Sequence, residues 1–317
     1  MRIPAVSGLS RIYDERKIAK MFEDGTFSNG ALVKSLQNLL QQGGERYIMK
    51  PRSSDCLDWL YEACPNFEIV LNDLRKYIEL AIYGNSSLSF VPILLAGDPG
   101  VGKTYFAKAL ARALATEQKY LNMGGTTAGF VLSGSNPTWM GSRVGQIATH
   151  FLESKVGNPL IVLDELDKAG GDPRFNTFDV LLQLLEPSTS SHFKDEFLDF
   201  EIDCSNIFWV GTANDTKRIP DYILSRMRTY EVPKPTLAQG RKIAQRQFTA
   251  LQRTHGFRFQ AELSSDVLDI LGAVSPRDMG KRLMDAMGSA RVGRREHLIA
   301  DDVPRGAQNG SRPMGFI

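Results

Sequence analysis

Cysteine is scarce in this sequence, and the few cysteines form no pattern. The 317 residues include three, Cys56, Cys64 and Cys204, with no C-x-x-C pair and no Cys/His cluster. A small, odd number of scattered thiols argues against a disulfide framework and against a zinc site. We therefore expect a reducing compartment, with the cytoplasm as the location of the protein.

The sequence also has no long apolar run and almost no net charge. Near the N-terminus, Asp14, Glu15, Arg16 and Lys17 interrupt the chain before an apolar signal core develops, and no stretch approaches the roughly 20 residues that span a membrane. The 38 basic and 36 acidic side chains leave a formal charge of +2, which implies no general attraction to nucleic acid or to a membrane. We expect no membrane partner, while a local basic patch stays open.

What the sequence does contain is a globular composition with alternating strand and helix patterns. With 42% hydrophobic and 23% charged residues, the chain is long enough for two domains. Buried apolar strands that alternate with helices indicate a parallel sheet covered on both faces, which is the α/β class. The expected strands are 91–96, 120–123, 160–163, 207–211 and 230–232, and the expected helices between them are 103–115, 144–155 and 178–185.

Four segments are expected along the chain. After residue 233 only helices are predicted. The first of them opens with the capping-box pair Thr236 and Gln239, and the last with Ser275 as N-cap and Pro276 at the first helical position. The predicted segments are 1–53, helical and variable; 54–232, the α/β domain; 233–303, a small helical domain; and 304–317, a disordered tail rich in Gly, Pro and Arg.

An eight-residue phosphate-binding pattern follows the first strand of the α/β domain and opens its first helix. Glycines at such a turn let backbone N–H groups point inward around the β- and γ-phosphates, and the positive end of the helix adds a favourable field. Lys103 would supply a point charge, and Thr104 a hydroxyl ligand for Mg²⁺. The sequence therefore predicts a nucleotide site with Mg²⁺. Its residues are Gly97, Asp98, Pro99, Gly100, Val101, Gly102, Lys103 and Thr104.

A second motif lies downstream, where the apolar strand 160–163 is followed by Asp164 and Glu165. It resembles a Walker B motif. A buried strand delivers both carboxylates to the carboxyl edge of the sheet, where open α/β folds bind ligands. Asp164 is predicted to orient Mg²⁺ and its waters, and Glu165 to polarise the attacking water. Taken alone, an Asp-Glu pair at a strand end is more often a solvated turn, so this prediction depends on the phosphate loop.

Three blocks carry a family resemblance. They are residues 158–168 around the two carboxylates, residues 181–187 with the sequence LLQLLEP, and the triplet 193–195 with the sequence FKD. Similar blocks occur in the same order in the ATPase module of the Lon protease family, so residues 91–283 resemble that branch of the ring-forming AAA+ ATPases. The resemblance implies a P-loop AAA+ fold with a five-stranded parallel sheet, ATP as the nucleotide, a helical lid over 233–303 and a homo-oligomer in the form of a hexameric ring.

The resemblance also assigns three polar residues outside the two motifs. Asn214 follows a strand that lies between the other two and takes the sensor 1 role at the γ-phosphate; without the family, an asparagine there is usually a turn former. Arg226 takes the place of the arginine that points into the neighbouring subunit's ATP, although Arg228 is close enough to confuse the assignment. Arg277 takes the sensor 2 role, against the alternative of a solvated first-turn arginine.

The family carries an aromatic pore-loop residue at the place of Trp139 and Met140. If this is carried over, the two side chains grip an extended polypeptide in the channel of the ring, because an aromatic beside a flexible side chain can hold unrelated sequences. Phe193 is then expected in a second pore loop. The competing interpretation makes Trp139 a packing residue.

The sequence departs from Lon at both ends. Lon uses a serine and lysine dyad C-terminal to this region for proteolysis, and residues 288–317 are too short and too polar to build such a domain. The first 85 residues show no clear match to the N-domain of Lon. We therefore expect ATP hydrolysis without peptide-bond cleavage, unless the chain works with a separate peptidase or is a fragment.

The main hypothesis is thus a Mg²⁺-dependent ATPase that remodels or threads a protein client. The alternative is an ATP-driven switch on DNA, as in loaders and transposition regulators of the same fold, which would use a basic C-terminal surface. Such runs of arginine are usually only solvated. A non-hydrolysing scaffold is disfavoured by the intact set of motif residues. The arginines of the proposed basic surface are Arg291, Arg294, Arg295 and Arg305.

Overall fold

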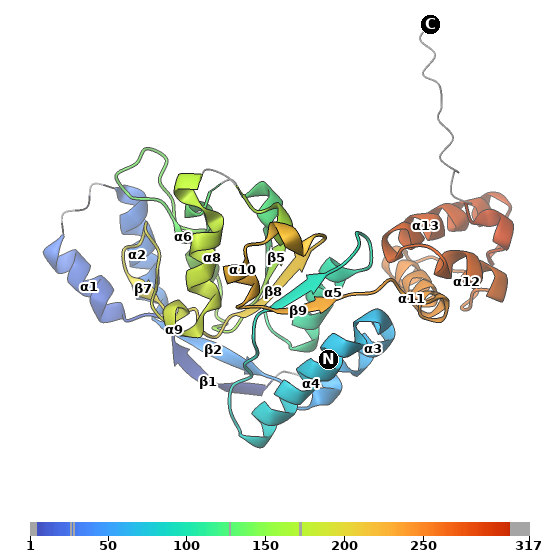
Figure 1. The fold of residues 1–317 in the computed structure, drawn as a ribbon, viewed down its shortest axis with the longest axis horizontal. Coiled ribbons are helices and arrows are strands. Elements are labelled where there is room, and N and C mark those ends of the chain that lie inside the picture. The colour runs from blue at the N-terminus through green and yellow to red at the C-terminus, as the bar shows by residue number, and fades with distance from the viewer. Residues whose placement is uncertain (1–4, 26, 28, 127, 171–172, 305–317) are drawn as a thin grey trace, which may run out of the picture. The chain divides into compact units, whose positions relative to one another are not determined.

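The computed structural model describes residues 5–25, 27, 29–126, 128–170 and 173–304 and divides into two compact units (Figure 1). The first unit contains the chain up to Tyr61, together with Phe67–Pro99 and Lys103–Pro233. The second contains Glu62–Asn66, Gly100–Gly102 and the chain from Lys234 onward.

A five-stranded sheet forms the centre of the first unit. Its strand order is β4-β5-β8-β3-β9, and every pair in it is parallel. The five predicted strands and the α/β class are therefore confirmed, and the strand before Asn214 does lie between the other two. The bounds are β3 Ile93–Ala96, β4 Gln118–Asn122, β5 Leu160–Asp164, β8 Phe208–Ala213 and β9 Arg228–Glu231.

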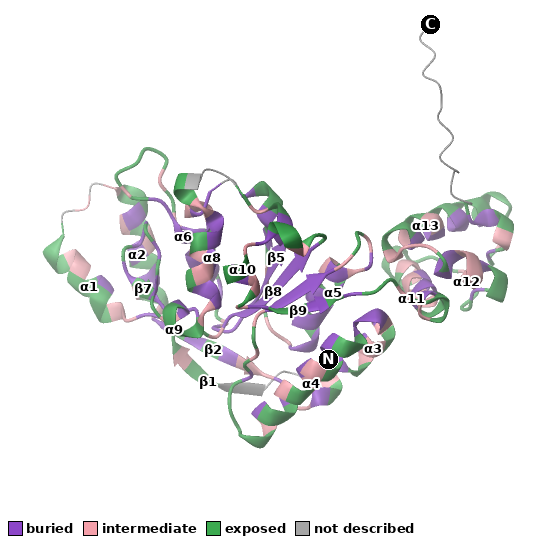
Figure 2. Cartoon of the chain, in the orientation of Figure 1, coloured by how far each residue is buried: buried purple, intermediate pink, exposed green. Residues whose placement is uncertain are grey.

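The central strands are buried on both faces, as Figure 2 shows by their purple colour. Ile161 and Leu163 of β5 belong to a core with apolar residues of α7 and α8, while the alternate residues Leu160 and Val162 are equally buried outside that cluster. Successive side chains of a strand point to opposite faces of the sheet, so burial of both sets means that helices cover both faces. The helices of this part are α3 Asp58–Ala63, α4 Glu68–Tyr83, α5 Lys103–Ala113, α6 Phe130–Ser133, α7 Gln146–Glu153, α8 Thr177–Leu185, α9 Pro187–Ser190 and α10 Asp221–Leu224.

The N-terminal segment packs onto the same core. Ile18 and Leu36, both fully buried, share a cluster with Leu121 and Leu163 of the central sheet. The helix expected around residues 31–40 is present, but the two flanking strands were not predicted from the sequence. They pair with each other in an antiparallel ladder, with a register shift between Val6 and Gly8. The bounds are β1 Ala5–Arg11, α1 Glu15–Asp24, α2 Gly30–Gln42 and β2 Glu45–Lys50.

A small hairpin, β6 Phe193–Lys194 with β7 Glu201–Ile202, completes the strands of the first unit. Phe193 is fully buried in the core. The expectation that Phe193 lines a channel as part of a second pore loop is therefore wrong, because a side chain without exposed surface cannot contact a client.

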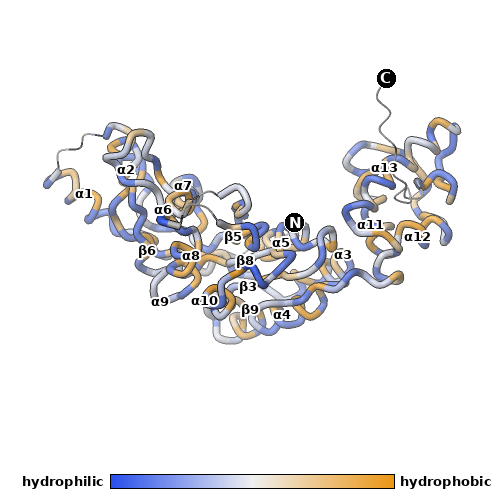
Figure 3. Tube along the Cα trace, turned by 45° about the horizontal axis from the view of Figure 1, so that its top comes forward, coloured by the Kyte–Doolittle hydropathy of each residue, from blue (hydrophilic) through white to orange (hydrophobic). Residues whose placement is uncertain are grey.

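In the part that the structure describes, residues 237–304 of the second unit contain helices and connecting loops. It contains α11 Leu237–His255, α12 Ser265–Gly272 and α13 Pro276–Val292, along which hydrophobic and hydrophilic residues alternate (Figure 3). The predicted capping box is present, since Thr236 Oγ1 accepts from Gln239 N and Thr236 N donates to Gln239 Oε1. Ser275 caps α13 as expected. The all-helical character of this part is thus confirmed.

Two further features of the structure concern membrane-spanning helices and the cysteines. Within the described residues, no helix is both long enough and apolar enough to cross a membrane. The three cysteines are free thiols, and burial raises the pKa of Cys64 to about 12, well away from a reactive thiolate.

Candidate nucleotide-binding site

The phosphate loop connects the buried strand β3 to the start of α5. Gly97 has a φ of 144°, and a Cβ at this position would lie 2.6 Å from the carbonyl oxygen of Val232. Gly100 and Gly102 also have positive φ values, 86° and 103°. Only glycine adopts these positive φ values without strain. This backbone conformation turns consecutive N–H groups toward one concave surface. The loop thus has the backbone form that binds phosphate.

Lys103, the first residue of α5, is 93% buried, since 7% of its surface is exposed. Its Nζ donates to the carbonyl oxygen of Asp98 at 2.9 Å and to Asn214 Oδ1 at 3.0 Å. It also donates to the carbonyl oxygen of Gly97. The ammonium therefore joins the phosphate loop to the end of β8, and it brings together two residues that the sequence predicted for one site.

Asp164 ends β5 and is 8% exposed. Its Oδ1 accepts from Thr104 Oγ1 at 2.8 Å and from Thr212 Oγ1 at 2.7 Å, and its Oδ2 accepts from the Tyr120 hydroxyl. Burial and this bond to a carboxylate raise the pKa of Tyr120 to about 12, so the phenol stays a donor. Three hydroxyl groups fix the orientation of this carboxylate.

Sequence reasoning missed the roles of Tyr120 and Thr212. In the sequence, the feature that could have pointed to them is their position near the carboxyl ends of two strands, β4 and β8. These strands flank β5 in the sheet. Strand order, which the residue pattern alone does not supply, was needed to identify them as neighbours of Asp164.

Glu165 has an unusual backbone conformation. Its φ is 57°, in the left-handed region, which costs a non-glycine residue about 1–2 kcal/mol. Its N–H donates to Thr212 Oγ1 at 3.1 Å, and its Oε1 accepts from Lys168 Nζ at 2.6 Å. Strain of this kind often accompanies a functional role. The turn keeps the Glu165 carboxylate partly exposed, next to the buried Asp164.

Asp167 is a second carboxylate of this turn that sequence reasoning left unassigned. It is 7% exposed, and its Oδ2 accepts from Asp215 N at 3.3 Å, while its Oδ1 has no hydrogen-bond partner among the described residues. The bond ties the turn after β5 to the residue that follows Asn214. The sequence places Asp167 two residues after Glu165, but it does not show that Asp215, which is 48 residues further along the chain, is its hydrogen-bond partner.

The structure separates Arg226 from Arg228. Arg226 follows α10, donates to the carbonyl oxygen of Tyr222 at 2.7 Å and lies 3.5 Å from Glu186. Arg228, in β9, pairs with Asp73 at 3.0 Å and stacks over Tyr230. Both arginines are therefore engaged inside their own unit, Arg226 by a backbone carbonyl and Glu186, and Arg228 by Asp73 and the Tyr230 ring.

Arg277 lies in the first turn of α13 and is exposed. Within the same unit, a Cβ added to Gly100 would meet Ser275 Oγ at 3.2 Å and Arg277 Cβ at 3.7 Å. The start of this helix therefore lies close to one residue of the phosphate loop.

Trp139 and Met140 lie in the loop between α6 and α7. Trp139 is 46% exposed and its ring meets Phe175 edge-on with centroids 5.8 Å apart, while Met140 is fully exposed. The loop closes on itself, since Ser135 N donates to Arg143 O at 3.1 Å and Trp139 N to Asn136 O at 3.0 Å. The loop presents the side chains of Trp139 and Met140 to solvent. It lies between the phosphate loop and the Asp164–Glu165 motif in the sequence and belongs to neither.

A family model matches the part of the chain that holds the site. Residues 93–234 match the model described as "ATPase family associated with various cellular activities (AAA)". The matched range includes Lys103, Asp164, Glu165, Asn214 and Arg226.

Curated relatives of this chain include Lon proteases. The Lon protease of Campylobacter concisus is 33% identical over 211 residues, which cover 66% of this chain and 26% of that protein. The Lon protease of Finegoldia magna is 30% identical over 256 residues, covering 78% and 33%. The mitochondrial Lon protease homolog of Homo sapiens is 36% identical over 188 residues, covering 59% and 20%. The chain thus spans about a third or less of the length of these relatives.

Among solved structures, the fold is similar to that of the Thermotoga maritima RuvB Holliday junction branch migration motor. The TM-score is 0.51 at 15% identity, over 74% of this chain and 66% of that chain. A point mutant of the same RuvB gives 0.52 at 15% identity, over 80% and 71%. At this level of identity the similarity concerns the fold alone, and it agrees with the five-stranded sheet followed by helices.

Proposed function

We propose that this chain, of which residues 93–234 match the AAA family of ATPases, hydrolyses ATP with Mg²⁺ and couples hydrolysis to the threading or remodelling of a protein client. One observation carries the proposal. Lys103 and Thr104 are neighbours at the start of α5, and each is hydrogen-bonded to the end of a different parallel strand: Lys103 Nζ to Asn214 after β8, and Thr104 Oγ1 to Asp164 at the end of β5. The two bonded pairs form a cluster at the carboxyl edge of the sheet. Catalysis of phosphoryl transfer depends mainly on positioning and charge, which this cluster provides.

The residues of the cluster have different roles in the proposed reaction. The phosphate loop and Lys103 bind the phosphates, and Asn214, which is exposed beside Lys103, contacts the γ-phosphate. Glu165 receives a proton from, or orients, the attacking water, because its partly exposed carboxylate can reach solvent while Asp164 cannot. Lys168, now bonded to Glu165, must release that carboxylate for it to act.

The oxygen donors fit Mg²⁺. Mg²⁺ usually takes one or two carboxylates, waters and substrate phosphates rather than an all-protein cage. Asp164 and the Thr104 hydroxyl, which lie 2.8 Å apart, form the kind of sparse oxygen set that Mg²⁺ prefers. When bound there, Mg²⁺ would neutralise charge on the β- and γ-phosphates.

Two arginines extend the proposal to a site shared between subunits of a ring. Arg226 would supply positive charge to the ATP of the neighbouring subunit, and such a finger contributes roughly 10³ to 10⁵ in rate. The geometry supports this indirectly, because Arg226 Nε is buried without a hydrogen-bond partner among the described residues and lies 3.5 Å from a partly exposed Glu186, while Nη1 donates to the carbonyl oxygen of Tyr222. Arg277 would act as sensor 2, on the support of its closeness to Gly100.

The client assignment is supported by the loop with Trp139 and Met140. A fully exposed methionine beside a half-exposed tryptophan is an apolar surface that water does not favour. Both side chains adapt to unrelated partners, which suits an extended polypeptide of any sequence. The edge-on contact with Phe175 accounts for part of the Trp139 surface, and the rest remains available for a client.

The test uses unfolded casein as the client and measures the steady-state ATPase rate with and without it. Glu165→Gln should lower the rate about a hundredfold or more while fluorescent-ATP binding persists, since only the proton-handling group is lost. Trp139→Ala should keep the basal rate and lose stimulation by casein. Glu262→Gln, a change of an exposed glutamate in the helical unit, is the control for the first variant. Undiminished hydrolysis by Glu165→Gln would remove the catalytic assignment.

Peptide-bond cleavage is not part of this proposal, because the chain spans only about a third or less of the Lon proteases that it matches. Work with a separate peptidase stays compatible with it.

The alternative, an ATP-driven switch on DNA, has less support from the residues that suggested it. Arg295 binds Asp302 through both Nη atoms at 2.6 Å, and Arg291 lies 3.9 Å from Glu296, while Arg305 lies outside the described residues. DNA binding that weakens steeply with salt would favour this alternative, since it reports phosphate contacts.

A further inference from the structure

Asn29 forms hydrogen bonds on two sides. Its Oδ1 accepts from Ala31 N at 3.0 Å and Leu32 N at 3.2 Å, so it is the N-cap of α2. Its Nδ2 donates to the carbonyl oxygen of Pro137 at 3.1 Å and to Ser142 Oγ at 3.2 Å. One amide group thus uses its acceptor for the N-terminal segment and its donors for the Trp139 loop, which we define as residues 135–143.

The two partners of Asn29 lie on opposite sides of the tip of the Trp139 loop. Pro137 precedes Trp139 by two residues and Ser142 follows it by three, and Ser142 Oγ is itself 3.3 Å from the carbonyl oxygen of Pro137. Ser142 N donates to the carbonyl oxygen of Trp139 at 3.2 Å. A bond to both sides therefore fixes the turn that carries Trp139 and Met140.

The stem of the Trp139 loop is held separately, by Asp195 of the β6–β7 hairpin. Asp195 is fully buried, and its Oδ2 accepts from Gly145 N at 2.9 Å. A Cβ at Gly134 would lie 2.6 Å from Asp195 Oδ1, so glycine is needed for this approach. The stem is thus anchored inside the core, while the tip has bonds within the loop and the two bonds from Asn29 of the N-terminal segment.

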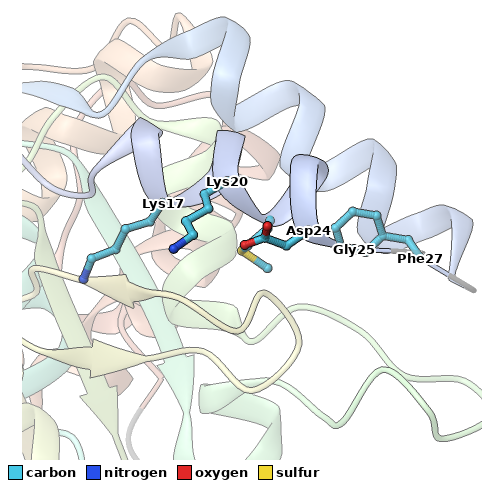
Figure 4. A pocket seen from close by; sticks show the side chains of 6 residues that line it. Lys17, Lys20, Asp24, Gly25 and Phe27 are labelled. Carbon is cyan, nitrogen blue, oxygen red and sulfur yellow. The ribbon is translucent and has the colours of Figure 1, made fainter.

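The N-terminal segment is in turn attached to the same hairpin. Asp203 N donates to the carbonyl oxygen of Ile12 at 2.7 Å, and Lys17 Nζ binds Glu201 Oε2 at 2.6 Å. Figure 4 shows Lys17 and Lys20 on α1 beside a shallow hollow that Asp24, Gly25 and Phe27 also line. The exposed Lys17 pair contributes little stability. The backbone bond and the shared core make the segment a fixed support.

We propose that Asn29 is a positioning residue for the Trp139 loop, through which the N-terminal segment sets the orientation of the side chains that contact a client. This rests on the proposed function, in which Trp139 and Met140 hold an extended polypeptide. It assigns a role to a segment that lies before the residues matched by the AAA family model.

The direct test changes the donor of Asn29 and keeps its acceptor. Asn29→Asp and Asn29→Ser both retain a good N-cap oxygen, so the thermal midpoint should stay within a few degrees of the unmodified protein. Both lose the amide donor. Hydrogen–deuterium exchange of the Trp139 and Ser142 amides should become about fivefold faster, the factor expected for the loss of one net hydrogen bond. The amide of Thr149 in α7, which bonds to Gly145 O, should keep its rate.

Agreement between the two variants excludes an effect of the new charge. Asn29→Ala removes both functions of the side chain, so it should show the faster exchange together with a lower thermal midpoint. Exchange of the loop amides that is unchanged in Asn29→Asp and Asn29→Ser would overturn the proposal.

The functional measurement uses unfolded casein. Asn29→Asp and Asn29→Ser should raise the casein concentration for half-maximal ATPase stimulation about fivefold and leave the basal rate unchanged. A faster-exchanging loop with unchanged stimulation would also overturn the proposal. If Trp139→Ala keeps full stimulation, the client assignment itself fails, and the exchange rates still report whether Asn29 holds the loop. The two failures are therefore distinguishable.

Discussion

Asp164 shows how much of the site depends on single hydroxyl groups. Its Oδ1 accepts from two threonines and its Oδ2 from a tyrosine, and each donor comes from a different element. A carboxylate that is 92% buried needs such donors, because an unpaired buried charge is costly. The orientation of the predicted Mg²⁺ ligand is thus set by one residue of the phosphate loop, Thr104, and by two residues outside the predicted motifs, Thr212 and Tyr120.

Thr212 has a further role, since it serves both carboxylates of the motif. Its Oγ1 donates to Asp164 and accepts from the N–H of Glu165, the residue with the left-handed backbone. Thr212→Val keeps the shape and removes the hydroxyl. We expect ATP hydrolysis to fall about tenfold with fluorescent-ATP binding retained, because a hydrogen bond to a charged group contributes about 1.5–3 kcal/mol.

The matched control is Thr212→Ser, which keeps the hydroxyl and should restore most of the rate. If the valine and serine variants lose the same activity, packing of the methyl group and not the hydroxyl bridge is what matters at this position.

At the scale of elements, the end of α13 depends on a buried carboxylate. Asp302 accepts two bonds from Arg295 and one from Ile299 N, and its side chain is 5% exposed. Hydrogen bonding by Arg295 lowers the pKa of Asp302 below its ordinary value of 3.8. The fold therefore favours the ionised form. The resulting stability is complete above the ordinary pKa and is lost as the pH falls through the lowered value.

Asp302→Asn should accordingly lower the thermal midpoint of the protein at about pH 7, and its difference from the unmodified protein should shrink as the pH falls below about 4. Asp301→Asn, a change of the exposed neighbour, should have no such effect at either pH. Thermal unfolding followed by circular dichroism over a pH series measures both. A difference for Asp302→Asn that stays constant with pH would show that charge is not the cause.

At the scale of the whole molecule, the proposal depends on a site shared between subunits. If the proposal is correct, Lys103→Ala should remove nucleotide binding from a subunit, and Arg226→Ala should remove the arginine finger that the subunit offers to its neighbour. Each variant alone should be inactive. In an equal mixture about a quarter of the interfaces combine an intact phosphate loop with an intact finger, so part of the ATPase rate should return.

Arg228→Ala in place of Arg226→Ala is the control for the mixing experiment, because Arg228 pairs with Asp73 in its own unit and should leave the ATPase rate largely intact. A mixture no more active than its separate components would exclude Arg226 as a residue that acts across an interface.

The sequence by itself determined the features that depend on neighbouring residues. The phosphate loop, the five strands of the sheet, the capping box of α11 and the N-cap of α13 are all set within a few residues, where glycine conformation, apolar periodicity and cap chemistry are local. For the same reason the α/β class, and the similarity to the AAA family that residues 93–234 match, could be predicted from residues 91–283.

Only the tertiary structure decided which distant residues meet. Lys103 and Asn214 are 111 residues apart, Asn29 and Ser142 113 apart, and no local pattern encodes such contacts. The burial of Phe193, wrongly expected in a pore loop, followed from packing of the hairpin on a core that includes the N-terminal segment. Strand order and long-range packing depend on the whole chain folding cooperatively, so neighbouring residues do not determine them. They bring three hydroxyl donors to Asp164, and they bring Asn29 to the Trp139 loop.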